Sequence, residues 1–150
     1  MKSMEKTLAN FYEEDFSVWA FRNAQLLREG RIAEADLEHI AEEIEDLGKE
    51  REHSLATQVR RLLAHLLQYH YQRFHRSRSW LGSIADARAE IEWVLEHSPS
   101  LKSSVHTMLE SEYRRAVGQA SAETGIPKES FPAECPYTVQ QIMQDEFLPE

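Results

Sequence analysis

Residues 36–75 decide the fold, and they read DLEHIAEEIEDLGKEREHSLATQVRRLLAHLLQYHYQRFH, with no proline. Apolar residues recur at steps of three and four, the spacing that places side chains on one face of an α-helix: Leu37, Ile40, Ile44 and Leu47, then Leu55, Val59, Leu62, Leu63, Leu66, Leu67 and His70. One continuous helix of this length would measure about 60 Å at 1.5 Å per residue. Either Gly48 marks a kink or break, or half of the helix extends to pack on a partner chain.

Three shorter helices are predicted around this stretch. Asp15 is a suitable N-cap for a helix that begins at Phe16 and ends before Gly30. Ser77 and Ser79 offer caps for a helix whose apolar stripe runs from Trp80 to Leu95. Ser98-Pro99 supplies a cap and a first-turn proline for a fourth helix, which Gly125 closes.

Beyond Ile126, Pro127, Pro132 and Pro136 force an extended segment. Thr138 is a suitable cap for a last short helix over residues 139–144. The sequence therefore predicts an all-α fold. We expect an antiparallel helical bundle of four main helices, one of them long, followed by a proline-rich C-terminal segment that ends in a short helix.

Length and composition indicate one domain over residues 1–150, with a flexible N-terminus (1–14) and an extended segment (126–150) that packs on the bundle. The 150 residues are 41% apolar, which excludes a disordered polyelectrolyte. The net charge of −9 disfavours nucleic acid and an anionic membrane as partners. Cys135 is the only cysteine and no apolar leader opens the sequence, so a cytoplasmic protein is expected.

The charges are segregated along the chain. Residues 34–46, EADLEHIAEEIED, hold acids but no lysine or arginine, whereas residues 53–85 hold five arginines and no acid. One interpretation is that acids near the start of a long helix and bases near its end complement the helix dipole. The other is that the two ends attract each other across an antiparallel pair of chains, which predicts a homodimer weakened by salt.

The stretch from Arg60 to His65 offers candidate catalytic residues. An arginine that holds a phosphate beside a histidine that transfers protons is sound ribonuclease chemistry. The spacing resembles the Arg-x4-6-His signature of HEPN ribonucleases, which are all-α and dimeric. Arg61 stands where those enzymes usually have a polar residue, and His65 lies on or near the apolar stripe, which favours a hydrogen-bonded core histidine.

A second candidate site combines arginines with aromatic residues between Tyr69 and Trp80. Such a cluster can stack on bases and neutralise phosphates, and we take Arg73, Arg76, Arg78 and Trp80 as its binding residues. The alternative is a helix end and a loop whose arginines pair with the acidic segment. The net charge favours this alternative.

A metal centre is not expected. Glu50 and His53 form a single Glu-x-x-His unit, whereas a di-iron bundle needs two such units and further carboxylates. His65, His70 and His75 are five residues apart, which rotates them off a common helical face. No cofactor is predicted.

Several blocks of sequence, in order, resemble a bacterial and mainly cyanobacterial family, domain-of-unknown-function family 29. The blocks span residues 11–149: FYEEDFSVW (11–19), AEEIEDLG (41–48), LLAHLL (62–67), RSRSW (76–80), SPSL (98–101), FPAECPYT (131–138) and FLP (147–149). The resemblance implies a small all-α bundle with a twisted helical core. It implies no activity and no catalytic residues.

The function favoured by the sequence is that of a non-enzymatic, self-associating interaction module, with a second copy or another protein as partner. The alternative is a HEPN-like, metal-independent ribonuclease or an RNA-binding protein that uses Arg60 and His65.

Overall fold

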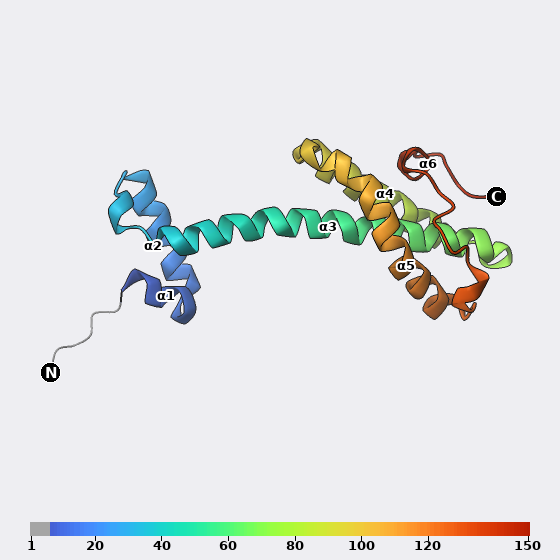
Figure 1. The fold of residues 1–150 in the computed structure, drawn as a ribbon, viewed down its shortest axis with the longest axis horizontal. Helices are drawn as coiled ribbons and strands as arrows, with labels where there is room; N and C mark the ends of the chain where they lie inside the picture. The colour runs from blue at the N-terminus through green and yellow to red at the C-terminus, as the bar shows by residue number, and fades with distance from the viewer. Residues whose placement is uncertain (1–6) are drawn as a thin grey trace. The chain divides into compact units, whose positions relative to one another are not determined.

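The computed structural model describes residues 7–150, and helices account for most of them (Figure 1). The described residues contain no β-strand. The helices are α1 (Leu8–Glu14), α2 (Phe16–Arg28), α3 (Leu37–Tyr71), α4 (Arg78–His97), α5 (Ser104–Thr124) and α6 (Val139–Met143). Short 3-10 turns lie between them: η1 (Ile32–Glu34), η2 (Arg73–His75), η3 (Pro99–Ser103) and η4 (Lys128–Ser130). The predicted all-α fold with one long helix is confirmed.

Helix α3 runs through Gly48 without a break. Of the two alternatives for the long segment, the structure has the continuous helix. A β-carbon added at Gly48 would meet no atom within 4 Å, so no close approach of another segment requires glycine there. The neighbouring glutamates and lysine are good helix formers, and a single interior glycine costs only about 1 kcal/mol.

The chain divides into two compact units, residues 1–50 and 51–150, which are described separately. The single domain predicted for residues 1–150 therefore stays a prediction. The first six residues of the predicted flexible N-terminus lie outside the described residues, and Leu8–Glu14 form α1.

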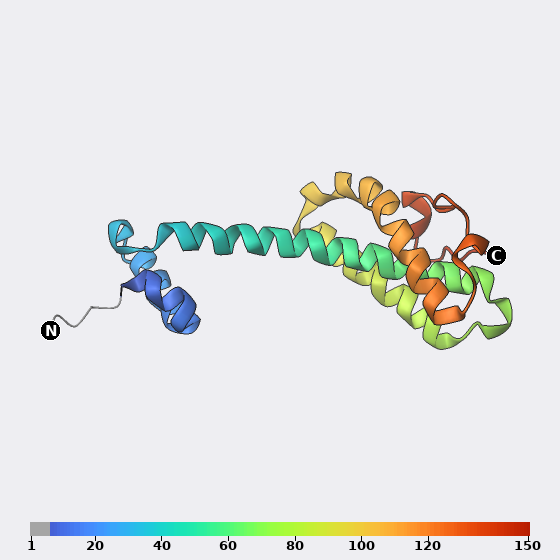
Figure 2. The same ribbon diagram turned by 60° about the horizontal axis from the view of Figure 1, so that its bottom comes forward.

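The second unit contains the main hydrophobic core. In both views α4 and α5 lie beside the second half of α3 (Figures 1 and 2). Each helix buries one apolar face, through Leu55, Val59, Leu62, Leu63, Leu66 and Leu67 of α3, Ile84, Ile91 and Val94 of α4, and Val105, Leu109 and Val117 of α5. The predicted periodicity of the second half of α3 is therefore that of a core face.

Local capping signals fix the helix ends where the sequence predicts them. The side chain of Ser77 accepts a hydrogen bond from the Trp80 amide at the start of α4. Gly125 ends α5 with a φ of 77°, a left-handed conformation that glycine adopts without strain. Thr138 and Gln141 form a capping box at α6. Pro99 begins a 3-10 turn rather than the first α-turn of α5.

The C-terminal segment is held to the second unit by a buried guanidinium. Arg88 of α4 is only 4% exposed. Its Nε donates to the carbonyl oxygen of Ile142 at 2.8 Å, Nη1 to that of Asp145 at 3.0 Å, and Nη2 to that of Phe147 at 2.8 Å. Burial lowers the pKa of Arg88 and the nearby Asp145 opposes this, but a guanidinium stays protonated at neutral pH. One side chain therefore orders the end of α6 and the residues that follow it.

The first unit is organised around a carboxylate. Asp36 Oδ2 accepts hydrogen bonds from Trp19 Nε1 at 2.9 Å and from His39 Nδ1 at 2.7 Å. The ring of Tyr12 stacks on that of His39, with 4.0 Å between centroids. The hydrogen bond that His39 donates to Asp36 is the main cause of a raised pKa for His39. These contacts join α1 and α2 to the start of α3.

We expect Arg88→Met to lower the free energy of unfolding by about 3 kcal/mol or more. The substitution keeps the apolar stem but leaves buried carbonyl groups without donors, at a cost of about 1–3 kcal/mol each. Urea denaturation followed by circular dichroism measures the change. Arg114→Met, at an exposed position of α5, is the matched control and should change stability by less than about 0.5 kcal/mol. A loss below about 1 kcal/mol in Arg88→Met would contradict the assigned role of the guanidinium.

Candidate functional site

Arg60, a predicted catalytic residue, faces an internal carboxylate. Its Nη1 lies 3.8 Å from Oε2 of Glu112 on α5, and Glu112 is 7% exposed. The other carboxylate oxygen, Oε1, accepts a hydrogen bond from Arg115 at 3.4 Å. Arg60 therefore serves first to neutralise a buried acid.

His65 is half-buried one turn further along α3. Its Nδ1 is shielded from solvent and makes no hydrogen bond with the described residues. Burial lowers the pKa of His65, Glu123 opposes this and Arg61 adds to it, so the imidazole is neutral at pH 7. No hydrogen bond joins Arg60 to His65 within residues 7–150, and the proposed ribonuclease chemistry stays a prediction.

The predicted binding cluster separates into an exposed part and an internal part. Arg76 points inward: its Nε donates to the Tyr69 carbonyl at 2.8 Å, and its guanidinium lies 4.0 Å from the centroid of the Tyr69 ring. Arg76 Nη2 also donates to the carbonyl of Pro149 at 3.4 Å. This arginine caps the end of α3 and holds the C-terminal segment. Trp80 is half-buried in the first turn of α4.

The exposed part of the cluster, which we call the basic loop, consists of Arg73, Phe74, His75 and Arg78. Phe74 is fully exposed, at 101% of its reference area. Arg73 and His75 precede and follow it in the chain, Arg78 begins α4, and all three are exposed. One nitrogen of Arg73 donates to the carbonyl of Glu150 at 3.2 Å. The basic loop therefore presents an aromatic ring among cationic and imidazole groups.

A second exposed surface lies on the first half of α3, and we call it the acidic face. Leu37, Ile44 and Leu47 are 49%, 64% and 65% exposed, although their spacing places them on one helical face. Acids occupy the same turns, and Glu38, Glu42, Glu45 and Asp46 are exposed. The apolar stripe predicted from the sequence is thus present, with Leu37, Ile44 and Leu47 exposed and Ile40 half-buried.

Two features of these surfaces were not predicted. Phe74 was not singled out, although a lone aromatic residue between Arg73 and His75, after the helical period has ended, is the signal that marks it. The bonds of Asp36 with Trp19 and His39 were also missed. Nothing local indicates them, because Trp19 is 17 residues away in the sequence.

These surfaces and the helical core define an all-α protein whose polar and apolar surface groups mark the candidate site. The chain belongs to the family described as domain of unknown function DUF29, whose model matches residues 11–148. The predicted resemblance is confirmed. Comparison with curated proteins and with solved structures gives no match.

None of the helices in residues 7–150 is long and apolar enough to cross a membrane. In the same part of the chain, no group of three or more His, Cys, Asp or Glu side chains is placed to hold a metal ion.

We expect His65→Leu to raise the free energy of unfolding at pH 7 by about 1 kcal/mol, because it removes a buried nitrogen that lacks a partner. The folded-state pKa of His65 is below its unfolded value of about 6.5, so the unfolded state binds more protons as the pH falls below that value. The wild-type chain therefore loses stability toward low pH, and the advantage of His65→Leu should grow there.

Urea denaturation of both proteins between pH 5 and pH 8 measures this difference. His53→Leu, at an exposed position of the same helix, is the control and should change the free energy of unfolding at pH 7 by less than about 0.5 kcal/mol. If the advantage of His65→Leu shrank on acidification, His65 would be charged in the folded protein and the argument would fail.

Proposed function

We propose that the chain is a self-associating interaction module, in which the acidic face of one copy binds the basic loop of a second copy. The observation that carries the proposal is the exposure of Leu37, Ile44 and Leu47 on one face of a helix. Apolar side chains aligned in this way, on a chain with a well-filled core elsewhere, are typical of a surface that a partner covers.

Charge complementarity supports a second copy as the partner. The acids of the acidic face all lie in residues 34–46, which contain no lysine or arginine, and the basic loop lies in residues 53–85, which contain no acid. A partner for the acidic face must supply cations around an apolar centre. The basic loop of another copy supplies both, because exposed Arg73 and Arg78 stand on either side of the exposed Phe74 in the sequence.

Two-fold symmetry completes the proposal. If the acidic face of one copy binds the basic loop of another, the same contact in the opposite direction closes a dimer and leaves neither surface unpaired. Each contact buries an apolar centre, which provides affinity, and a charged rim, which provides orientation and rate of association.

We expect light scattering after size exclusion to give a mass near two copies at low salt and a mass falling toward one copy of 17.5 kDa at high salt. The dependence on salt follows from screening, since the Debye length shrinks from about 10 Å at 0.1 M to about 3 Å at 1 M. A mass of one copy at every protein and salt concentration would contradict the proposal.

Variants locate the two surfaces. Ile44→Gln and Phe74→Ser should each raise the dissociation constant about tenfold or more, because each removes an apolar side chain buried on association, worth about 1.5–3 kcal/mol. Phe21→Ser is the matched control, because Phe21 is 78% exposed on α2 and lies outside both surfaces. Equal weakening in Phe21→Ser would show that the effect is not specific.

Charge reversal tests the pairing itself. Arg73→Glu with Arg78→Glu should weaken self-association, whereas Lys102→Glu, on the exposed turn η3, should not. In a mixture of the arginine variant with a chain that carries Glu42→Lys and Glu45→Lys, unlike chains should associate. One contact then pairs the two unchanged surfaces, and the other pairs the two surfaces of reversed charge. Failure of the mixture to associate better than either variant alone would overturn the assignment of the basic loop as the partner surface.

A further inference from the structure

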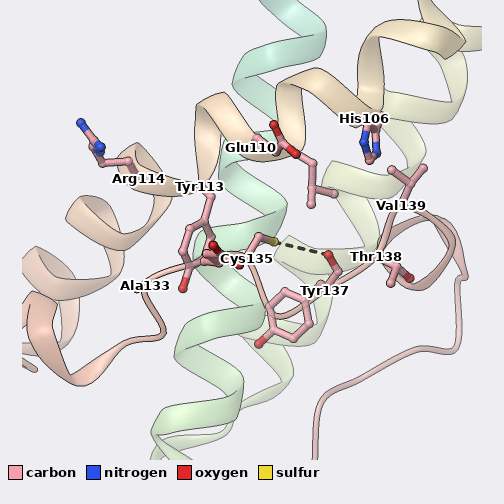
Figure 3. Close-up of a pocket in the computed structure, with 11 residues that line it drawn as sticks. His106, Glu110, Tyr113, Arg114, Ala133, Cys135, Tyr137, Thr138 and Val139 are labelled. Atoms are coloured by element: carbon pink, nitrogen blue, oxygen red, sulfur yellow. Dashed lines mark hydrogen bonds between the residues drawn. The ribbon is translucent and has the colours of Figure 1, made fainter.

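A cavity of about 650 Å³ lies between α5 and the extended segment that leads into α6 (Figure 3). One wall comes from α5, through His106, Leu109, Glu110 and Tyr113, and the other from residues 133–139. Cavities of roughly 300–1,000 Å³ are the usual size for small-molecule sites. Neither surface proposed for self-association contributes a residue to this cavity.

The buried floor of the cavity, formed by Leu109, Tyr113 and Tyr137, presents mainly apolar groups to a ligand, because its hydroxyl groups lie within hydrogen-bond distance of other groups of the protein. Tyr113, Tyr137 and Leu109 are 4%, 5% and 6% exposed. The Tyr113 hydroxyl donates to the carbonyl of Pro132 at 2.7 Å, and the Tyr137 hydroxyl lies 3.3 Å from Nδ1 of His70. The Cys135 thiol donates to the carbonyl of Tyr137 at 3.4 Å (Figure 3). A ligand therefore meets ring surfaces, methyl groups and sulfur.

The floor also carries no charge at neutral pH. Burial raises the pKa of Tyr113 to about 12, with smaller contributions from Cys135 and Tyr71. Burial likewise raises the pKa of Tyr137 and that of the Cys135 thiol. Phenol rings in this neutral form keep the electron-rich faces that attract cations.

Carboxylates supply the charge at the mouth of the cavity. Glu110 and Glu134 line it and are exposed. Arg114 also belongs to the lining, but its side chain is directed away from Cys135 and Tyr137 (Figure 3). The wall formed by residues 133–139 holds one acid, Glu134, and no lysine or arginine. A cation is attracted to this mouth and an anion is repelled.

We propose that this cavity binds an organic cation, an ammonium group carried by an aromatic or alkyl body. The apolar body packs against Leu109, Tyr113 and Tyr137. The ammonium group lies at the mouth, near Glu110 and Glu134, where it stays partly hydrated. The proposal is independent of self-association, since the cavity is complete within one chain.

Two probes with the same apolar body test the charge preference. We expect 4-phenylbutylamine, added to the full-length chain, to bind at least fivefold more tightly than 4-phenylbutanoate. Amide chemical shifts from NMR measure both affinities and locate the site, because the shifts should concentrate in residues 106–114 and 133–139. Binding of the carboxylate as tight as that of the amine would overturn the proposal, and so would shifts concentrated elsewhere.

Two substitutions at exposed positions test the assigned residues without disturbing the core. Glu110→Gln with Glu134→Gln should weaken binding of 4-phenylbutylamine about fivefold. The double substitution should leave binding of 4-phenylbutanol, an uncharged ligand with the same apolar body, unchanged. Glu129→Gln, on the exposed turn η4, removes one carboxylate outside the lining and should change neither affinity. Val139→Phe, which fills the cavity, should weaken both ligands. If the amine bound equally well to the double variant, the carboxylates would not recognise the ammonium group and the proposal would fail.

Discussion

The second unit depends on one buried cation, the guanidinium of Arg88. Its three shortest hydrogen bonds end on carbonyl oxygens of residues 142–147, more than fifty residues further along the chain. A short helix such as α6 leaves its last carbonyls without partners, and a cation placed there satisfies them and complements the helix dipole. By holding α6, Arg88 also sets the end of the extended segment 133–138, which forms one wall of the cavity beside α5.

Some arginines of this chain bind groups inside the protein, and others remain exposed. Arg88 and Arg76 bind main-chain carbonyls, and Arg60 faces the buried Glu112. Arg73 and Arg78 remain exposed, close in the sequence to a fully exposed phenylalanine, Phe74. The basic character of residues 53–85 is therefore smaller at the surface than in the sequence, and much of what remains lies in residues 73–78. In the proposed dimer, the partner would bind this short basic segment and its phenylalanine rather than an extended positive groove.

Local signals explain how much of the fold was predictable. Ser77, Gly125 and Thr138 act within four residues of their own positions, and the sequence located all three helix ends. The burial of side chains was less predictable, because the same apolar periodicity occurs in both halves of α3. Leu55 in the second half is fully buried, whereas Leu47 in the first half is 65% exposed. The candidate site was the least predictable part. Arg76 and Arg78 are two residues apart, yet only Arg76 points inward, because the carbonyl groups of Tyr69 and Pro149 accept its hydrogen bonds. The position of Pro149 depends on how distant parts of the chain pack, which the local sequence does not indicate.

The net charge of −9 understates how acidic the exposed surface is, because several arginines bind groups inside the protein. Arginines bonded to buried carbonyls still count toward the total but contribute little to the surface, so the exposed surface is dominated by acids even more than the composition indicates. Both proposals, self-association and cation binding, rest on this excess. In the first, the acidic face attracts the few exposed arginines of another copy; in the second, the carboxylates at the cavity mouth attract a small cation, and in each case the apolar centre restricts which cations bind. In both proposals the exposed carboxylates favour a positively charged partner, and the apolar side chains beside them favour a partner whose apolar part fits their shape.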